Sequence, residues 1–328
     1  MSHIPTLTDI FKAQQLLRQY LLPTLLHHYP ALSQLLEAEV YVKHENHTPI
    51  GSFKIRGGIN ALAQLDEDVK KRGVIVASSG NFGQAMAFAG QMFGVKAVVV
   101  LPENPNPGKA EAIKSFGGEL VLYGRDYDES REHILAIAAE KGYYYLNDAE
   151  EPAFVAGLGT LGLEILEQLP DTEIVIAPVG GGGLISSLCI AGKGIKPDLA
   201  IIGVCSEKAP SPYLSWKEGR LVEAPMETDA EGIAVRSSFA APQKIMREML
   251  DDFVLVSEDE IKRAIVLMLE KTHNLAEGAG AAPLAATLKM KDQIRNKKTV
   301  LILSGGNISL DQLRDSLSKG IAATGKQD

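Results

Sequence analysis

The sequence predicts an α/β protein with two domains, each containing a parallel sheet. Three observations indicate this fold class: short β-branched runs alternate with longer periodic stretches, the runs are continuously apolar, and glycine-rich turns follow several of them. Continuous apolar strands are typical of parallel sheets, because crossover helices bury both faces of such a sheet.

The first half of the chain predicts three strands, each followed by a helix. Pro102 and Pro105 bound the second strand, and Gly117 and Gly118 end the second helix. The expected strands are 73–77, 96–101 and 119–123, and the expected helices are 81–93, 109–115 and 128–141.

The second half repeats this alternation in kind but not in sequence. The expected strands are 173–179, 200–205 and 299–303, and the expected helices are 155–169, one from 184, 258–271 and 310–320. Weak boundaries near 48–72 and 142–152 indicate that a smaller domain is inserted into a larger one. We therefore expect a large domain of residues 1–66 and 148–328 and a small domain of residues 67–147.

Composition excludes several classes of protein. The chain has 328 residues, 45% of them hydrophobic, and 33 basic against 41 acidic residues give a net charge of −8. This balance argues against a general nucleic-acid or anionic-membrane binder. No apolar run approaches the length of a membrane span, and two cysteines cannot make a disulfide framework or a four-cysteine zinc site. We expect a soluble, reduced, cytoplasmic enzyme.

Glycine-rich turns mark the expected ligand edge, because ligands of open parallel sheets bind beyond the carboxyl ends of strands. Four consecutive glycines at 180–183 expose backbone N–H groups just ahead of a helix, which predicts a phosphate site. The pattern matches neither the dinucleotide fingerprint nor the P-loop. The other turns lie at 78–81, 304–307 and 277–280.

Lys54 lies just inside an expected helix start, in the stretch GSFKIRGG. A lysine there is by itself usually a solvated surface residue. Beside a phosphate cradle, however, it could form a Schiff base with a phosphate-bearing aldehyde.

Four stretches, GSFKIRGG, SSGNFGQA, PVGGGGL and LSGGN, occur in this order and spacing. Together they resemble the fold type II pyridoxal-phosphate (PLP) enzymes, in the branch of the threonine/serine dehydratases and serine racemases. The resemblance runs from about residue 5 to residue 320. It implies two open, twisted, mostly parallel sheets flanked by helices, as in the tryptophan synthase β chain, with the SSGN loop in the small domain.

The resemblance also implies roles for individual residues. Lys54 would carry PLP and act as the base at Cα, and Ser79 would be either a second base, as in racemases, or a hydrogen-bond donor to the substrate carboxylate. The cofactor would be held by Phe53, Lys54, Asn81, Gly180, Gly181, Gly182, Gly183, Glu277 and Ser304. The substrate would be bound by Ser78, Ser79, Gly80, Asn81 and Phe82.

Two departures from the family pattern bear on function. Phe82 stands where many relatives have histidine, which indicates either a packing change or a pocket that accepts aromatic groups. The racemase-like divalent site would fall on Cys205, Ala209 and Ser211, where both carboxylates are missing. We therefore predict no tight divalent site there, although a monovalent or weakly bound divalent cation stays open.

Some histidines invite other interpretations. His44 and His47 flank Glu45 without a third ligand at sensible spacing, so we do not predict a metal site there. The pair His27 and His28 is expected at the end of an amphipathic helix.

The function implied is a PLP-dependent ammonia-lyase that eliminates water from L-threonine or L-serine and releases a 2-oxo acid and ammonia. Alternatives are a phenylserine or 3-hydroxyaspartate dehydratase and a serine or aspartate racemase. A different class is a non-catalytic PLP or amino-acid sensor. We expect no C-terminal effector domain, which would favour a catabolic role, and we expect a homodimer or homotetramer by analogy.

Overall fold

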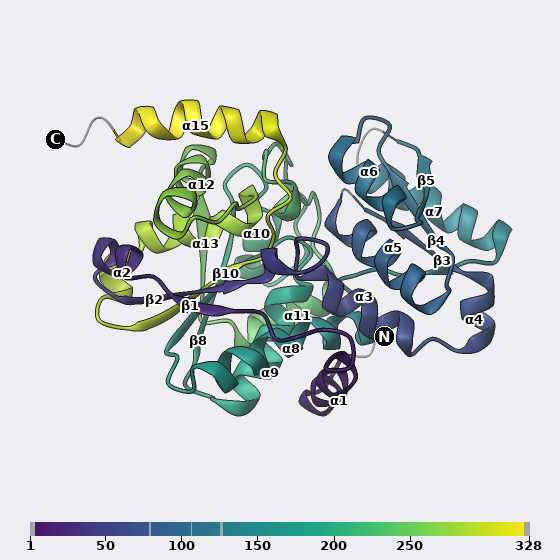
Figure 1. Cartoon of the computed structure of the whole chain (residues 1–328), viewed down its shortest axis with the longest axis horizontal. Coiled ribbons are helices and arrows are strands. Elements are labelled where there is room, and N and C mark those ends of the chain that lie inside the picture. The colour runs from purple at the N-terminus through teal and green to yellow at the C-terminus, as the bar shows by residue number, and fades with distance from the viewer. Residues whose placement is uncertain (1–3, 79, 106, 125–126, 325–328) are drawn as a thin grey trace. The chain divides into compact units, whose positions relative to one another are not determined.

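The computed structural model describes residues 4–78, 80–105, 107–124 and 127–324 of the chain. Backbone contacts divide the chain into two compact units, shown with their elements in Figure 1. The first unit comprises residues 1–21 and 48–160, and the second comprises residues 22–47 and 161–328. The domain boundaries expected from the sequence, 1–66 with 148–328 and 67–147, stay a prediction.

The first unit contains a four-stranded, fully parallel sheet in the order β5-β4-β3-β6. Its strands are β3 (Val74–Ala77), β4 (Ala97–Leu101), β5 (Glu119–Leu122) and β6 (Tyr144–Tyr145). The expected strands at 73–77, 96–101 and 119–123 are confirmed. The helices of this unit are α1 (Leu7–Leu17), α3 (Lys54–Ala63), α4 (Glu67–Arg72), α5 (Asn81–Phe93), α6 (Pro107–Ser115) and α7 (Tyr127–Lys141).

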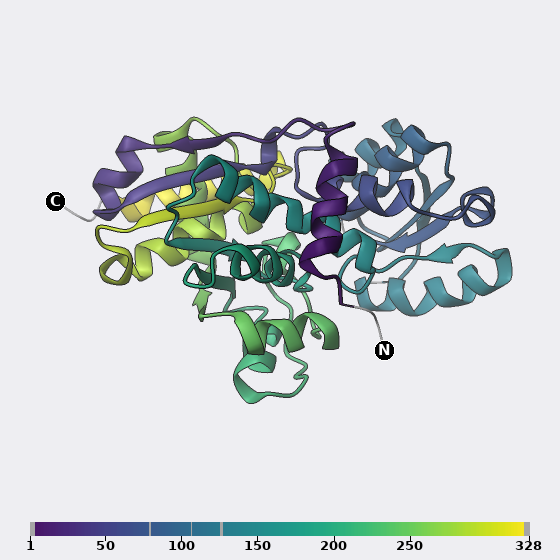
Figure 2. The same ribbon diagram turned by 90° about the horizontal axis from the view of Figure 1, so that it is seen from below.

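Alternate residues of β3 and β4 face opposite sides of this sheet, as the period of a strand requires. Val74 and Val76 pack with residues of α3 and α5, whereas Ile75 and Ala77 pack with Ile134 of α7. Figure 2 shows α7 on the opposite side of the sheet from α5 and α6. Burial on both faces explains why these strands have no polar side.

The second unit contains a six-stranded sheet in the order β1-β2-β10-β7-β8-β9. All neighbours are parallel except β1, which is antiparallel to β2. The strands are β1 (Leu26–His28), β2 (Glu39–His44), β7 (Ile174–Pro178), β8 (Ala200–Ser206), β9 (Asp252–Val256) and β10 (Lys298–Leu303).

The expectation that His27 and His28 end a helix is wrong. Both lie in β1, where His27 is opposite Val42 and His28 is opposite Tyr41 of β2. Helical spacing is a weak local preference, and pairing with β2 overrides it here.

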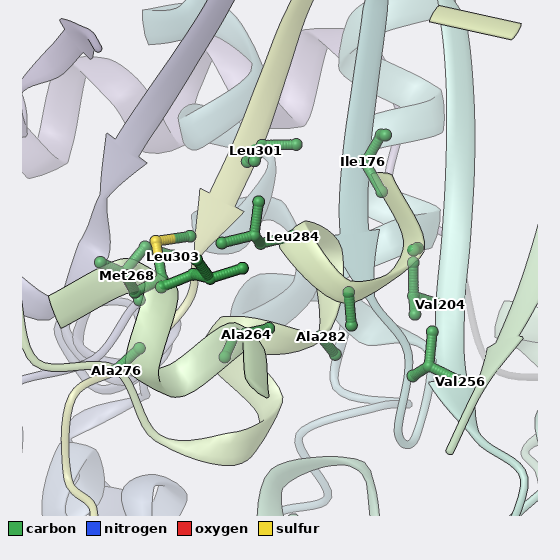
Figure 3. Close-up of a cluster of buried hydrophobic side chains, with 14 of the residues drawn as sticks. Ile176, Val204, Val256, Ala264, Met268, Ala276, Ala282, Leu284, Leu301 and Leu303 are labelled. Atoms are coloured by element: carbon green, nitrogen blue, oxygen red, sulfur yellow. The ribbon is translucent and has the colours of Figure 1, made fainter. Parts of the chain in front are cut away.

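One core cluster of the second unit lies between one face of its sheet and α13 (Gly278–Lys289). Figure 3 shows Leu284 of α13 beside Leu301 and Leu303 of β10, in a cluster that also includes Ile176 and Val204. Helix α8 (Pro152–Gln168) begins in the first unit and ends in the second. The remaining helices of the second unit are α2 (Pro30–Leu36), η1 (Glu45–His47), α9 (Gly183–Ile195), α10 (Ser211–Glu218), η2 (Glu231–Ile233), α11 (Ala240–Met249), α12 (Glu258–Thr272), α14 (Lys291–Ile294) and α15 (Leu310–Thr324).

A buried ion pair ties β2 to the second half of α8. The Nζ atom of Lys43, whose side chain is fully buried, lies 2.7 Å from Oε2 of Glu164 and donates to the Thr24 carbonyl oxygen at 2.8 Å. The ion pair offsets the cost of burying the Lys43 charge.

Among the described helices, none is long and apolar enough to cross a membrane.

Candidate active site

In the first unit, Lys54 is the first residue of α3, as the sequence predicts. Its Nζ atom forms an ion pair with Oδ2 of Asp148, and the two side chains are 21% and 17% exposed. Asp148 follows β6, which is parallel to β3, and the turn from Ser78 follows β3. Because carboxyl ends of parallel strands meet at one edge of a sheet, the ion pair and this turn belong to the same edge.

Three aromatic rings surround the Lys54 amine. Its Nζ atom lies 5.2 Å from the ring centroid of Phe53, 5.7 Å from that of Phe82 and 5.8 Å from that of Phe154. An ammonium is attracted to the face of an aromatic ring. The rings line part of the space around the amine, and the Lys54 side chain stays 21% exposed.

Phe82 packs as a buried residue and also adjoins the candidate site. It is 6% exposed, and its ring meets that of Phe154 edge to face at 5.1 Å. The Phe154 ring has room because residue 57 is glycine: a Cβ there would lie 2.5 Å from two ring atoms. Phe82 therefore packs against Phe154 and also contributes to the surroundings of Lys54, so both interpretations of this residue stay predictions.

The turn before α5 is organised by Ser78. The Ser78 hydroxyl oxygen accepts hydrogen bonds from the N–H groups of Gly80, at 3.0 Å, and Gly83, at 2.8 Å. Gly80 lies against Lys109, whose Cδ atom is 2.4 Å from where a Cβ would be. Asn81 begins α5. Ser79, the predicted second base, lies outside the described residues.

In the second unit, the four glycines connect β7 to α9 as expected. Gly182, with φ +94°, is the N-cap of α9, and no side chain caps the first turn of that helix. Gly180 lies so close to η2 that a Cβ would be 2.6 Å from the Gly232 carbonyl oxygen. Uncapped N–H groups next to bare backbone provide space and hydrogen-bond donors for a phosphate.

Ser304 and Glu277 lie near this loop in the fold of the second unit. Ser304 follows β10, which is the neighbour of β7 in the sheet, and is 2% exposed. Glu277 is the N-cap of α13 and is 6% exposed, and its N–H donates to the Gly305 carbonyl oxygen at 3.1 Å. Its Oε1 atom lies 3.7 Å from the position of a Cβ on Gly232. Gly232 thus neighbours both Gly180 and Glu277.

A polar network packs against the loop after Ser304. His44 Nδ1 donates to Asn46 Oδ1 at 3.2 Å, and its Nε2 atom accepts from the Tyr29 hydroxyl at 2.9 Å. Asn46 lies 3.2 Å from where Gly306 would carry a Cβ. His44 is 1% exposed, and burial is the main cause that lowers its pKa to about 4. His44 is therefore neutral at pH 7.

The structure groups the predicted residues into two sets. Sequence reasoning missed three residues that contact or adjoin these sets, namely Asp148, Phe154 and Gly232. Asp148 follows a strand of two residues, which is too short to produce a pattern. The first set is Phe53, Lys54, Ser78, Gly80, Asn81 and Phe82 in the first unit, and the second is Gly180, Gly181, Gly182, Gly183, Glu277 and Ser304 in the second unit.

The cysteines and the racemase-like cation positions lie in the core. Cys189 and Cys205 are fully buried, and burial raises the pKa of both thiols to about 12. Ala209 and Ser211 are also fully buried, and the Ser211 hydroxyl donates to the Val222 carbonyl oxygen at 2.8 Å. Among the residues that the structure describes, no three His, Cys, Asp or Glu side chains are grouped to hold a metal ion.

A cavity of about 230 Å³ lies between α12 and α15 in the second unit. Lys262 in its wall is already paired with Asp229, at 3.1 Å, and with Asp315, at 2.7 Å. No predicted site residue lines it. Its lining residues are Asp229, Ala230, Glu258, Ile261, Lys262, Ile265, Gly278, Ile308, Asp311, Gln312, Asp315 and Ser316.

The two sets of residues fit a PLP cofactor by their chemistry. The glycine cradle before α9 suits a phosphate group, because a Cβ on Gly180 or Gly182 would meet backbone or Pro242 at 2.6–2.7 Å and fill it. Lys54 offers a primary amine for an aldehyde, and the buried hydroxyl of Ser304 offers a neutral hydrogen-bonding partner for a ring nitrogen.

Comparisons with known proteins agree with this fit. A family model described as pyridoxal-phosphate dependent enzyme matches residues 17–305. The chain is 39% identical to the L-threonine ammonia-lyase of Thermotoga maritima over 98% of this chain and 80% of that protein. The processed form of threonine deaminase isoform 2 from Solanum lycopersicum has a TM-score of 0.90 at 33% identity, covering 96% of this chain and 87% of that one. Maize serine racemase has a TM-score of 0.90 at 27% identity, covering 98% and 100%. The chain therefore belongs to the pyridoxal-phosphate dependent enzyme family.

Proposed function

We propose that this protein is an ammonia-lyase that eliminates water from L-threonine or L-serine to give a 2-oxo acid and ammonia. The observation that carries the proposal is the Lys54 amine, which lies at the first turn of α3, in contact with Asp148 and near the Phe82 ring. The names of relatives that match nearly the whole chain support the choice of threonine.

Each predicted residue has a proposed role. Lys54 binds the cofactor aldehyde and Phe53 lies beside the ring. Asn81 hydrogen-bonds the ring oxygen, Ser304 the pyridine nitrogen, and Glu277 lies at the polar edge. The backbone of Gly180–Gly183 binds the phosphate. The turn of Ser78, Ser79, Gly80 and Asn81 binds the substrate carboxylate, with Phe82 at its side.

When bound, PLP supplies an electron sink that makes the Cα proton of an amino acid removable. Lys54, once its amine is exchanged for that of the substrate, takes this proton at its Nζ atom. The rings of Phe53, Phe82 and Phe154 lie around this amine and give it a partly apolar environment. With PLP bound, the Ser304 hydroxyl would be a neutral hydrogen-bonding partner for the pyridine nitrogen. The β-hydroxyl would leave as water with the proton that Lys54 holds at Nζ. Positioned proton transfer contributes roughly 10²–10⁴-fold.

The experiment measures 2-oxo-acid release by PLP-loaded protein from L-threonine, L-serine, D-serine, L-threo-3-hydroxyaspartate and threo-phenylserine. Lys54→Ala is compared with Lys71→Ala, which removes a lysine that is 74% exposed in the same unit. We expect turnover of L-threonine or L-serine that Lys54→Ala abolishes and Lys71→Ala leaves unchanged. Release of no 2-oxo acid from any of the five amino acids would overturn the proposal and would favour the hypothesis of a non-catalytic sensor.

Two alternatives have their own readouts. The edge-to-face pair of Phe82 and Phe154 near Lys54 favours a phenylserine dehydratase as the second candidate, since it offers an aromatic wall. Turnover confined to threo-phenylserine would establish it. Racemisation needs Ser79 as a second base, so Ser79→Ala would abolish inversion and keep elimination if the protein is a racemase.

We also propose a cellular location, an assembly state and a domain division for the enzyme. We place it in the cytoplasm, as a homodimer or homotetramer, with residues 67–147 as the small domain that carries the SSGN loop. Analytical ultracentrifugation measures the assembly directly.

A further inference from the structure

An acidic residue, Asp148, stands at the amine that the proposed reaction exchanges. Its carboxylate contacts the Nζ atom of Lys54, although 94 residues separate the two in the sequence. The Asp148 side chain is 17% exposed, so its carboxylate is largely removed from water.

The turn that carries Asp148 is held in shape by its neighbours. The Asn147 carbonyl oxygen accepts hydrogen bonds from the N–H groups of Glu150, at 3.2 Å, and Glu151, at 2.8 Å. The Asn147 side-chain oxygen accepts from Ala149 N–H at 3.0 Å, and the Tyr144 hydroxyl donates to Glu151 at 2.7 Å. Asp148 is therefore fixed beside Lys54 by backbone geometry and does not reach the amine from a mobile segment.

We propose that Asp148 selects substrates by charge: it admits amino acids whose β-substituents are neutral or hydrogen-bond donors and rejects those with a second carboxylate. The inference rests on the proposed function at one point, that the substrate amine takes the place of the Lys54 amine. The β-substituent then lies a few bonds from the position that Asp148 contacts. A β-hydroxyl donates to the Asp148 carboxylate, whereas a β-carboxylate meets a like charge.

The size of the discrimination follows from Coulomb's law. Two like charges roughly 4–8 Å apart, at an effective dielectric constant of about 20, reduce affinity by about 30- to 1,000-fold. Serine, threonine and phenylserine escape this penalty. Aspartate and 3-hydroxyaspartate incur it.

The test is equilibrium binding of L-aspartate and L-asparagine to the PLP-loaded protein, measured by isothermal titration calorimetry. These ligands have nearly the same shape, differ by one charge and lack a β-hydroxyl leaving group. We expect the wild type to prefer L-asparagine by about 30-fold or more. Asp148→Asn should bring the ratio to within about threefold by strengthening the binding of L-aspartate.

Glu150→Gln is the matched control, because it makes the same charge change two residues away, where the side chain contacts Asn147. It should leave the ratio as in the wild type. Asp148→Ser is the second variant, and it decides the question if Asp148→Asn does not fold.

Equal binding of the two ligands by the wild type, no binding of L-asparagine, or an unchanged ratio in both Asp148 variants would overturn the inference. The proposed function is judged separately, by 2-oxo-acid release from L-serine and L-threonine. A protein that releases no 2-oxo acid yet shows the expected binding ratios would refute the lyase activity and retain the charge selection by Asp148.

Discussion

Replacing Gly180 by alanine tests the phosphate cradle, because the structure leaves no room for a side chain there. An added Cβ would lie 2.6 Å from the Gly232 carbonyl oxygen and 3.3 Å from the Ile233 Cα atom. Both neighbours are backbone, so no flexible side chain can yield. Ordinary contact begins at 3.4 Å, and therefore the loop or η2 must move by 0.8 Å, the difference between 3.4 and 2.6.

Such overpacking in a well-packed region typically costs about 1–3 kcal/mol. If the loop moves, the N–H groups ahead of α9 leave their positions, and the overpacking lowers the affinity for the cofactor. We expect the affinity for PLP to fall by roughly 5- to 150-fold. If η2 moves instead, Gly232 shifts against Glu277, and the melting temperature of the apo-protein falls.

The assay is absorbance titration of apo-protein with PLP, together with thermal unfolding of the same sample. Gly162→Ala is the control, since its Cβ would meet only side chains at 3.0 and 3.4 Å before the next backbone atom at 3.9 Å, near a small apolar void. A Gly180→Ala protein with PLP affinity within about twofold of the wild type and an unchanged melting temperature would refute the reasoning.

Three further predictions concern stability and reactivity. Glu164→Gln should lower the free energy of unfolding by about 3–5 kcal/mol, because it leaves the buried Lys43 charge without its carboxylate; urea unfolding measures this loss. Burial lowers the pKa of His44 to about 4 from 6.5, so the unfolded chain binds more protons between these values. Stability should therefore fall as the pH falls from 6.5 to 4, by up to about 3 kcal/mol, and a His44→Gln protein whose unfolding free energy kept the same pH slope would contradict this. Cys189 and Cys205, whose thiol pKa values burial raises to about 12, should react with a thiol reagent only after denaturation; labelling of the native protein within seconds would show otherwise.

Much of the local structure could be predicted from the sequence, since the signals are local. Both ends of α5 follow from Gly80 before it and from Gly94 after it, where the chain adopts φ +67°. The apolar run before Gly180 predicts β7 and the loop after it. Local signals failed where a distant partner decides, as at His27, which β2 draws into a strand.

The chemistry of the site divides in the same way. The stretches of sequence that identify the family contain Lys54, the glycines 180–183, and Ser304. Each of these features lies at a helix start or a strand end, where local sequence patterns are informative. Asp148 shows no such pattern, and only the fold brings it to Lys54 across 94 residues. The sequence by itself determined the cofactor and the class of reaction. The tertiary structure decided which charge faces the Lys54 amine, because that depends on long-range packing of a turn against a helix and not on any local spacing.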